Sequence, residues 1–347
     1  MDNINLKRLA KELNLSASTI SRALRGSHEI SQQTKDRVKA LAEKLGFQPN
    51  PYASSLRQSK SKTIAVILPE IENNFFSQVM SGVEDVAQVK EYHVLIYLTH
   101  EDYTREKSIL QVLRNGRVDG VMISVSNTTH SFEHLQEIHD SGLPLVFFDR
   151  TVSSIGVPSV STDDSAAAFK ATELLLDNGC RNIAFLSMSD SLSISSRRKD
   201  GYLKALEARG LSGEAQALEC GNNNTVNREL IRRLLEGKKR PDAIFAAMEK
   251  LAINTYEVCK ELKLAIPEQL KVISFSNQAA SALFNPPLSA IVQPAYDIGR
   301  EAAAILFKII DKKTLAPREQ KAIFPSQIVE RQSSLFAKPV KKARNKK

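Results

Sequence analysis

The chain has 347 residues and a formal net charge of +9, which permits about two to three domains with cores of their own. The charge is uneven: residues 1–62 hold 12 Lys and Arg against 5 Asp and Glu, and residues 338–347 hold 6 against none. The three widely spaced cysteines exclude a disulfide framework or a CxxC zinc site, and no apolar run reaches the ~18 residues that span a bilayer. With a charged start and no signal peptide, we expect a cytoplasmic protein that touches a polyanion at one end.

Two short helices joined by a tight turn are predicted over residues 5–25. Leu6, Leu9 and Leu13 repeat at helical spacing, and Ser16 stands where an N-cap would start a second helix at Ala17. The outer face of the second helix carries small or cationic side chains: Ala17, Ser18, Ser21 and Arg22. A DNA major groove admits such a face, because small residues let the backbone approach base edges. The alternative is an ordinary helical hairpin with a solvated basic face.

A third helix should begin after Ser31 and end at Gly46, which completes a helical headpiece over residues 1–49. Residues 50–62 follow as a hinge, because Asn50 and Pro51 signal a short helix that reaches about Arg57 before a serine- and lysine-rich linker. So short a helix is unstable alone in water. We expect it to order only against a partner helix and DNA.

From Thr63 onward, apolar strands alternate with amphipathic helices, which predicts parallel sheets covered on both faces. The expected strands are 63–69, 92–98, 119–124, 144–149, 158–162, 182–187, 242–247 and 271–275. The expected helices lie near 76–90, 104–115, 130–141, 164–178, 197–209, 226–236, 250–263 and 295–311. We expect a body over 63–337 in two subdomains, about 63–161 with 293–325, and about 162–292, followed by a disordered basic tail over 338–347.

The run SASTISRALRGSHEISQQTKDRVKALAEKLGFQPNPYASSLR, residues 16–57, closely resembles the DNA-binding headpiece of the lactose and galactose repressor family. The resemblance continues through IAVILPEIENNFF, DGVMIS, PLVFFDR, RRKDGYLKALEARG, PDAIFAA and PPLSAIVQPAYDIGREAA. It implies a helix-turn-helix headpiece on an α/β body like the periplasmic binding proteins, with a cleft between two parallel-sheet subdomains. It also implies paired hinge helices in the minor groove, where Ala53 and Leu56 contact DNA and Leu56 wedges a base step open. The alternative is that Leu56 packs on the body.

The headpiece candidates divide by the part of DNA that they would touch. Base contacts are predicted for Ala17, Ser18 and Arg22, and phosphate contacts for Ser16, Thr19, Ser21 and Asn50.

Candidate effector residues follow the strands at their carboxyl ends, where open α/β sheets bind ligands. After the first strand they are Asn74 and Phe75, with Asn73 and Phe76 beside them; after the third, Ser124; and after the fourth, Asp149 with Arg150. Phenylalanine, carboxylate and guanidinium in one cleft suit a sugar-like ligand, although one of Phe75 and Phe76 could instead belong to the core. The resemblance adds Arg198, whose position binds the effector in the family, and it adds Asn223, Glu249 and Ser276.

This chain departs from the family at three of those positions. The family usually has Asn-Asp at Met248–Glu249, an aspartate at Ser276 and often an aromatic at Asn223. A pocket that lost a carboxylate could take a different ligand or an anionic one, or could have lost its effector. The adjacent acids Asp163 and Asp164 are interpreted as a solvated helix start.

No catalytic motif, metal-ligand spacing or nucleotide loop is present in the sequence, so we expect no enzyme activity, no metal and no cofactor. The predicted function is a transcriptional regulator, usually a repressor in this family, that binds a pseudo-palindromic operator in double-stranded DNA. A small molecule in the cleft, a sugar or sugar derivative, would set its operator affinity. The tail lacks the leucine heptads of a tetramer, so we expect a homodimer without a membrane partner. The alternative is a soluble sugar-binding protein without a DNA role.

Overall fold

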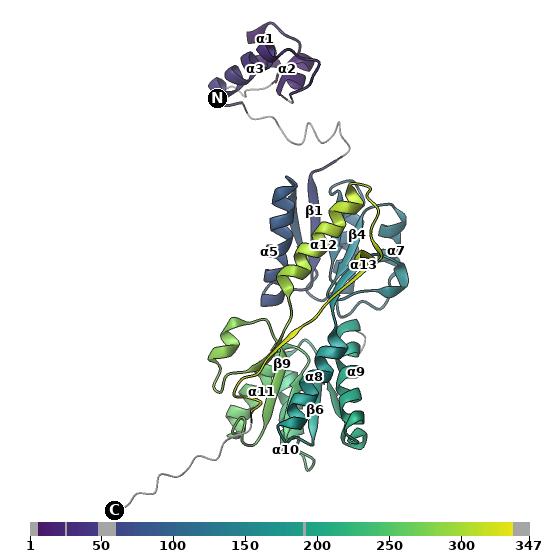
Figure 1. The fold of residues 1–347 in the computed structure, drawn as a ribbon, viewed down its shortest axis with the longest axis vertical. Helices are drawn as coiled ribbons and strands as arrows, with labels where there is room; N and C mark the ends of the chain where they lie inside the picture. Colours follow the sequence, from purple (N-terminus) through teal and green to yellow (C-terminus); the bar gives the residue numbers. More distant parts are fainter. Residues whose placement is uncertain (1–5, 25, 48–59, 190–191, 336–347) are drawn as a thin grey trace, which may run out of the picture. The chain divides into compact units, whose positions relative to one another are not determined.

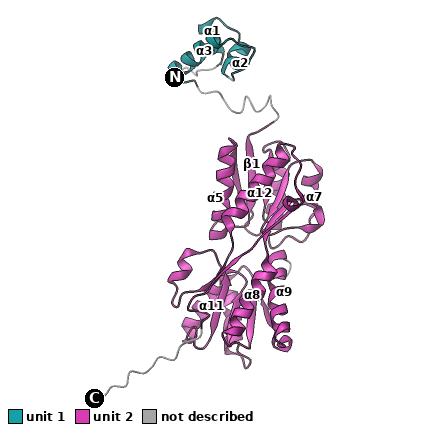
Figure 2. Ribbon diagram, in the orientation of Figure 1, with its two compact units in different colours: residues 1–59 teal, residues 60–347 magenta. Residues whose placement is uncertain are grey.

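The computed structural model describes residues 6–24, 26–47, 60–189 and 192–335. The chain divides into two compact units, residues 1–59 and 60–347, here called the headpiece and the body (Figure 2). The predicted hinge helix, with Asn50, Ala53 and Leu56, and the predicted tail lie outside the described residues.

The headpiece packs three helices, α1 (Leu6–Leu13), α2 (Ala17–Leu24) and α3 (Gln32–Leu45), around a small apolar core. The fully or nearly fully buried members of that core are Leu9, Ile20, Ala23, Val38 and Ala42. The cap predictions are confirmed. The Ser16 hydroxyl accepts a hydrogen bond from the Thr19 amide at 3.0 Å, the Ser31 side chain accepts from the Thr34 amide, and Gly46 ends α3 with φ +64°.

The body contains two six-stranded sheets. In the first, the order is β11 (Lys321–Phe324), β5 (Ser159–Thr162), β4 (Leu145–Phe148), β3 (Gly120–Ile123), β1 (Thr63–Leu68), β2 (His93–Leu98), all parallel. In the second, the order is β12 (Gln327–Val329), β10 (Ser289–Val292), β9 (Lys271–Phe275), β8 (Ala243–Ala246), β6 (Ile183–Ser187), β7 (Gln216–Glu219), with β12 antiparallel. The parallel sheets expected from the sequence are confirmed.

Helices cover both faces of each sheet (Figure 1). On the first sheet, one face is covered by α5 (Asn74–Val89) and α12 (Ala295–Ile310), and the other by α6 (Tyr103–Leu113) and α7 (Glu133–Asp140). We call this sheet and its helices lobe 1, which also includes α13 (Pro317–Gln320) and the short 3₁₀ helix Ser153–Ile155. On the second sheet, the pairs are α8 (Asp164–Asp177) with α9 (Ser193–Ala208), and α10 (Asn224–Glu236) with α11 (Glu249–Leu262). This assembly, with the 3₁₀ helices Ser212–Glu214 and Ala279–Leu283, is called lobe 2.

Two glycines let α5 and α12 lie backbone against backbone. A Cβ atom on Gly82 would stand 2.1 Å from the Tyr296 carbonyl oxygen, and one on Gly299 would stand 2.1 Å from the Val79 carbonyl oxygen. Real Cβ atoms do not approach backbone atoms so closely, so both positions require glycine.

The chain passes between the lobes three times, after β5, after β10 and between β11 and β12. The sequence pointed to the first two passages, near residues 161–164 and 293–294, and missed the third. It also missed β7, β11 and β12, which are half-exposed strands at sheet edges and show no apolar run. It missed β10 as well, although Ala290, Ile291 and Val292 form a short apolar run in that strand. Helix α9 begins at Ser193, one turn before the expected start near residue 197.

Candidate functional site

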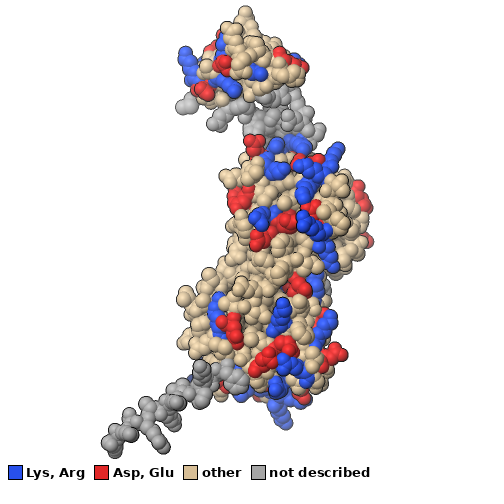
Figure 3. All heavy atoms as spheres, viewed as in Figure 1, with Lys and Arg blue, Asp and Glu red and all other residues tan. Residues whose placement is uncertain are grey.

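The predicted reading face of the headpiece is open to solvent. Ala17, Ser18 and Arg22 on α2 are exposed, as is Ser16 before it, while Thr19 and Ser21 are half-buried. Arg22 pairs with Glu29 at 3.0 Å, and the two side chains are 55% and 53% exposed. An ion pair this exposed contributes little to stability, and Arg22 can therefore leave Glu29 to bond another acceptor at low energetic cost. Lys and Arg side chains stand out on the headpiece surface in Figure 3.

The body holds a cavity of about 300 Å³ between the facing ends of its two sheets. Lobe 1 contributes residues that follow β1, β2 and β4: Pro69, Glu70, Ile71, Glu72, Asn73, Phe75, Phe76, Leu98, His100, Glu101, Asp149 and Arg150. Lobe 2 contributes Met188, Ile194, Arg198, Asn222, Met248, Glu249, Lys250, Phe275, Ser276 and Asn277, joined by Gln293 from the passage into α12. A partly open cavity with a mixed apolar and polar wall suits a small polar ligand.

Five of the eight sequence-predicted effector residues line this cavity: Phe75, Asp149, Arg198, Glu249 and Ser276. The other three do not. Asn74 opens α5, and its neighbour Asn73 faces the cavity instead. Asn223 caps α10 by accepting from the Thr225 and Val226 amides, and Asn222 takes the place in the wall.

Ser124 follows β3 as predicted, but its side chain is fully buried away from the cavity. Its hydroxyl has no hydrogen-bond partner among the described residues.

Asp149 is the most constrained of the five. Its backbone has φ +58°, a left-handed conformation that costs energy for most side chains and is less unfavourable for aspartate. The residue is 5% exposed, and burial raises the pKa of its carboxyl group. Its carboxylate accepts no hydrogen bond from the described residues, and the Arg150 Nε atom lies 3.9 Å away. A strained, buried and unsatisfied carboxylate in a cavity wall is typical of a ligand-binding residue.

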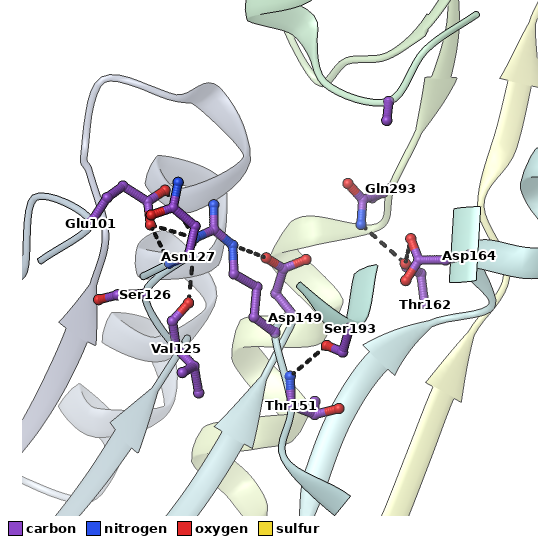
Figure 4. Close-up of polar contacts among 12 residues, drawn as sticks. Glu101, Val125, Ser126, Asn127, Asp149, Thr151, Thr162, Asp164, Ser193 and Gln293 are labelled. Atoms are coloured by element: carbon purple, nitrogen blue, oxygen red, sulfur yellow. Dashed lines mark hydrogen bonds and ion pairs between the residues drawn. The ribbon is translucent and has the colours of Figure 1, made fainter. Parts of the chain in front are cut away.

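The neighbouring Arg150 is held by Glu101. Its Nη1 atom donates to both Glu101 carboxylate oxygens at 2.9 and 2.8 Å, and to the Val125 carbonyl oxygen at 3.3 Å (Figure 4). Sequence reasoning missed Glu101, although the signal was the same as for the others, since Glu101 follows β2 just beyond its carboxyl end.

Arg198 is 3% exposed and bonded on every nitrogen. Nε donates to Asp164 at 2.8 Å, Nη1 to the Ala247 carbonyl oxygen at 2.6 Å and Nη2 to Gln293 at 3.4 Å, while the guanidinium carbon stacks 3.7 Å above the Phe275 ring. Asp164 is 1% exposed, so the predicted solvated helix start is wrong for this residue. It is right for its exposed neighbour Asp163, which caps α8. Arg197 and Arg198 of α9 both form ion pairs with Asp164, whereas neither forms one with Asp163 among the described residues.

The two departures at Glu249 and Ser276 lie in contact. The Ser276 hydroxyl donates a hydrogen bond to the carboxylate of Glu249, the first residue of α11. Burial raises the pKa of Glu249, and its hydrogen bonds to Ser276 and to the Gln278 backbone oppose that effect. At these two positions the pocket therefore has one carboxylate where the family usually has two, and Ser276 is bonded to it.

The lobes touch through polar side chains around the cavity. Asn127 donates to Asn222 at 3.0 Å, and Asn277 donates to Gln78 at 3.0 Å. Figure 4 shows two more: the Thr151 amide donates to the Ser193 hydroxyl at 3.3 Å, and Gln293 in the second passage donates to Thr162 at 3.0 Å. Polar contacts of this kind can be exchanged for bonds to water or to a ligand.

Comparison with known proteins agrees with both parts of this geometry. Residues 5–50 match the model of bacterial regulatory proteins, lacI family, and residues 172–334 match a periplasmic binding protein-like domain. The catabolite control protein A of Priestia megaterium is 31% identical over 315 residues, which is 90% of this chain and 94% of that protein. The chain belongs to the lacI family.

Two solved structures in the same family share its fold. The lac repressor dimer bound to operator and the anti-inducer ONPF superposes with a TM-score of 0.84 at 19% identity, over 96% of this chain and 100% of the repressor. A lacI family regulator from Enterococcus faecium with bound ribose superposes with a TM-score of 0.70 at 24% identity, over 80% and 100% of the two chains. In the part of the chain that the structure describes, no helix is long and apolar enough to cross a membrane.

Proposed function

We propose that this lacI family regulator is a homodimeric repressor whose affinity for a pseudo-palindromic operator is controlled by a sugar or sugar derivative in the inter-lobe cavity. One observation carries the proposal: a single chain joins a headpiece with an exposed α2 face to a body whose cavity has walls from both lobes. The relatives that bind operator and ribose support it.

The cavity gives the control a physical basis. A ligand changes DNA affinity only if it binds two arrangements of the lobes unequally. Phe75 and Asp149 stand on lobe 1, and Glu249 and Ser276 on lobe 2. A ligand that contacts all four favours one lobe spacing over others.

On DNA, Ala17, Ser18 and Arg22 would read base edges, and Ser16, Thr19, Ser21 and Asn50 would bind phosphates. Two headpieces on a two-fold axis require an operator with inverted symmetry. The proposed hinge contacts are Ala53 and Leu56, with Leu56 as the minor-groove wedge. The protein would work in the cytoplasm, without enzyme activity or cofactor.

The decisive experiment is a selection of binding sites from random duplex DNA with the full chain, followed by a salt titration on the selected site. The expected result is a site with inverted symmetry, bound by a dimer, with an affinity that falls steeply as salt rises because phosphate contacts release counterions. A monomeric protein that ignores duplex DNA would overturn the proposal in favour of a sugar-binding protein without a DNA role.

The effector half is tested separately with Asp149→Asn, which keeps the shape of the side chain and its tolerance for a left-handed backbone. The variant should bind the selected operator like the parent chain and lose its response to the sugar. The matched control is Asp163→Asn, which removes an exposed carboxylate outside the cavity. An unchanged response in Asp149→Asn would remove Asp149 from the site.

A further inference from the structure

The charged groups around the cavity are not balanced. Five carboxylates line it, from Glu70, Glu72, Glu101, Asp149 and Glu249, against three cationic side chains, from Arg150, Arg198 and Lys250. The more informative difference is which of these groups are already bound to the protein.

All three cations are engaged. Arg150 donates to Glu101, and Arg198 donates to Asp164, which lies behind the cavity wall and adds another acid to the region. Lys250 donates through Nζ to the Asn222 carbonyl oxygen at 2.8 Å. Nη1 of Arg150 and all three nitrogens of Arg198 therefore already have acceptors, and Arg197 also pairs with Asp164. The Arg150 Nε atom has no hydrogen-bond partner among the described residues, but it lies 3.9 Å from the Asp149 carboxylate.

Apart from Glu101, the acids of the cavity form no close ion pair with a described residue. Glu70, Glu72 and Glu249 form no ion pair with any described residue, and Asp149 has only the Arg150 Nε atom at 3.9 Å. Asp149 is only 5% exposed, and no described residue donates a hydrogen bond to its carboxylate. Burial is the main cause of the raised pKa of Glu249, and the nearby charge of Glu70 adds to it. Burial also raises the pKa of Asp149, although Arg150, Arg198 and Arg197 oppose that effect. A buried carboxylate without a hydrogen-bond donor is unfavourable until a partner arrives, whereas Glu72 is exposed to solvent.

We propose that the natural ligand of this cavity carries a positive charge, and that its class is a sugar or polyol with a protonated amine. The inference deepens the proposed function and rests on it, because it assumes that the cavity binds the effector. The amine pairs with the carboxylates of Glu70, Glu72 and Glu249, while hydroxyl groups bond Asp149 and Ser276. Apolar edges of the ligand lie against Phe75.

Serine in place of the usual aspartate at position 276 leaves Glu249 as the acid at this end of the cavity. The Ser276 hydroxyl and the Gln278 backbone both bond the Glu249 carboxylate, and its remaining lone pairs can accept from an ammonium group. An ammonium offers three donors and no acceptor, which matches a wall with several acceptors in excess. A neutral sugar satisfies these oxygens with hydroxyls but leaves their charge uncompensated.

The test is isothermal titration of the full chain with matched sets of sugars. Each of D-glucosamine, D-galactosamine and D-mannosamine is compared with its parent hexose, its N-acetyl derivative and the hexose 6-phosphate. The expected result is that at least one amino sugar binds about tenfold or more tightly than its three matched forms, a difference of about 1.4 kcal/mol. Tightest binding of a neutral or phosphorylated form, or no binding by any member of the panel, would overturn the inference.

Variants locate the charge contact. Glu249→Gln and Glu72→Gln should each weaken the amino sugar by about tenfold and leave the parent hexose within about twofold. Glu257→Gln is the matched control, because Glu257 lies on the same helix as Glu249 and pairs at the surface with Arg228. Equal losses for the amino sugar and the hexose would show a merely structural role and refute the charge contact.

The two proposals fail in different ways. An operator that responds to a neutral sugar and not to an amino sugar keeps the proposed function and refutes the charge class. An amino sugar that binds in the cavity without altering operator affinity keeps the charge class and refutes the effector role.

Discussion

The ion pair between Asp164 and Arg198 offers the sharpest test of the structure. The adjacent acids Asp163 and Asp164 look alike in sequence, yet Asp164 is 1% exposed and contacts Arg197 and Arg198, whereas Asp163 is exposed and caps α8. Asp164→Asn keeps the size of the side chain and removes its charge. The Arg198 guanidinium then stays buried without its carboxylate.

The expected loss follows from what Arg198 retains. Removing one partner of a buried ion pair costs about 3–5 kcal/mol. Arg198 keeps its bonds to Ala247 and Gln293 and its stacking on Phe275, so we expect the lower end, about 3 kcal/mol. For a body of this size that corresponds to a fall of roughly 6–12 °C in the melting temperature.

Asp163→Asn is the control. Asparagine caps a helix as well as aspartate does, so only a favourable charge near the helix dipole is lost, at about 0.3–1 kcal/mol. The assay is thermal unfolding of the full chain followed by circular dichroism, with both variants in the same buffer. Equal melting temperatures for the two variants would refute the burial and pairing assigned to Asp164.

Four further predictions follow from other contacts. Gly299→Ala should lower stability by about 1–3 kcal/mol in chemical denaturation, because the added Cβ meets the Val79 carbonyl oxygen, whereas Gly213→Ala, with open space around it, should change little. Burial raises the pKa of Asp149, so the unfolded chain ionises at a lower pH than the folded protein, and the free energy of unfolding falls as the pH rises between the two pKa values. Asp149→Asn should therefore raise the melting temperature at neutral pH, and this gain should shrink as the pH is lowered toward the ordinary pKa of aspartate. Arg22→Ala should weaken binding to a selected operator by about 1–3 kcal/mol and relax base preference at one position per half-site, while Arg37→Ala on α3 loses the same charge and should leave base preference unchanged. Leu56→Ala should reduce operator affinity much more than affinity for random duplex, and an equal reduction of both would rule out the wedge.

Local sequence signals determined much of the fold. The headpiece helices follow from apolar spacing and from the caps at Ser16, Ser31 and Gly46, each of which acts within one helical turn. The central strands of both sheets are continuous apolar runs because helices cover both of their faces. The short edge strands β7, β11 and β12 carried no such signal, because half of their side chains face solvent.

The effector cavity was only partly predictable from the same kind of reasoning. The rule that ligands bind at the carboxyl ends of strands located Phe75 and Asp149, and applied to β2 it would have located Glu101. Of the pair Asn73 and Asn74 that it named, only Asn73 lines the cavity, and Asn223, which the resemblance added, lies beside the lining residue Asn222. Neighbouring residues at a helix start point in different directions, so an error of one position moves a side chain out of the wall.

The sequence by itself thus determined the helical headpiece, the parallel sheets and the family, because each depends on spacing within a short segment or on motifs read along the chain. Only the tertiary structure decided which of two adjacent aspartates is buried, that Glu249 reaches Ser276, and that the cavity's cations have partners while Glu70, Glu72 and Glu249 form no ion pair with any described residue. These properties depend on distances between segments far apart in the chain, and burial and charge pairing exist only once those segments have come together.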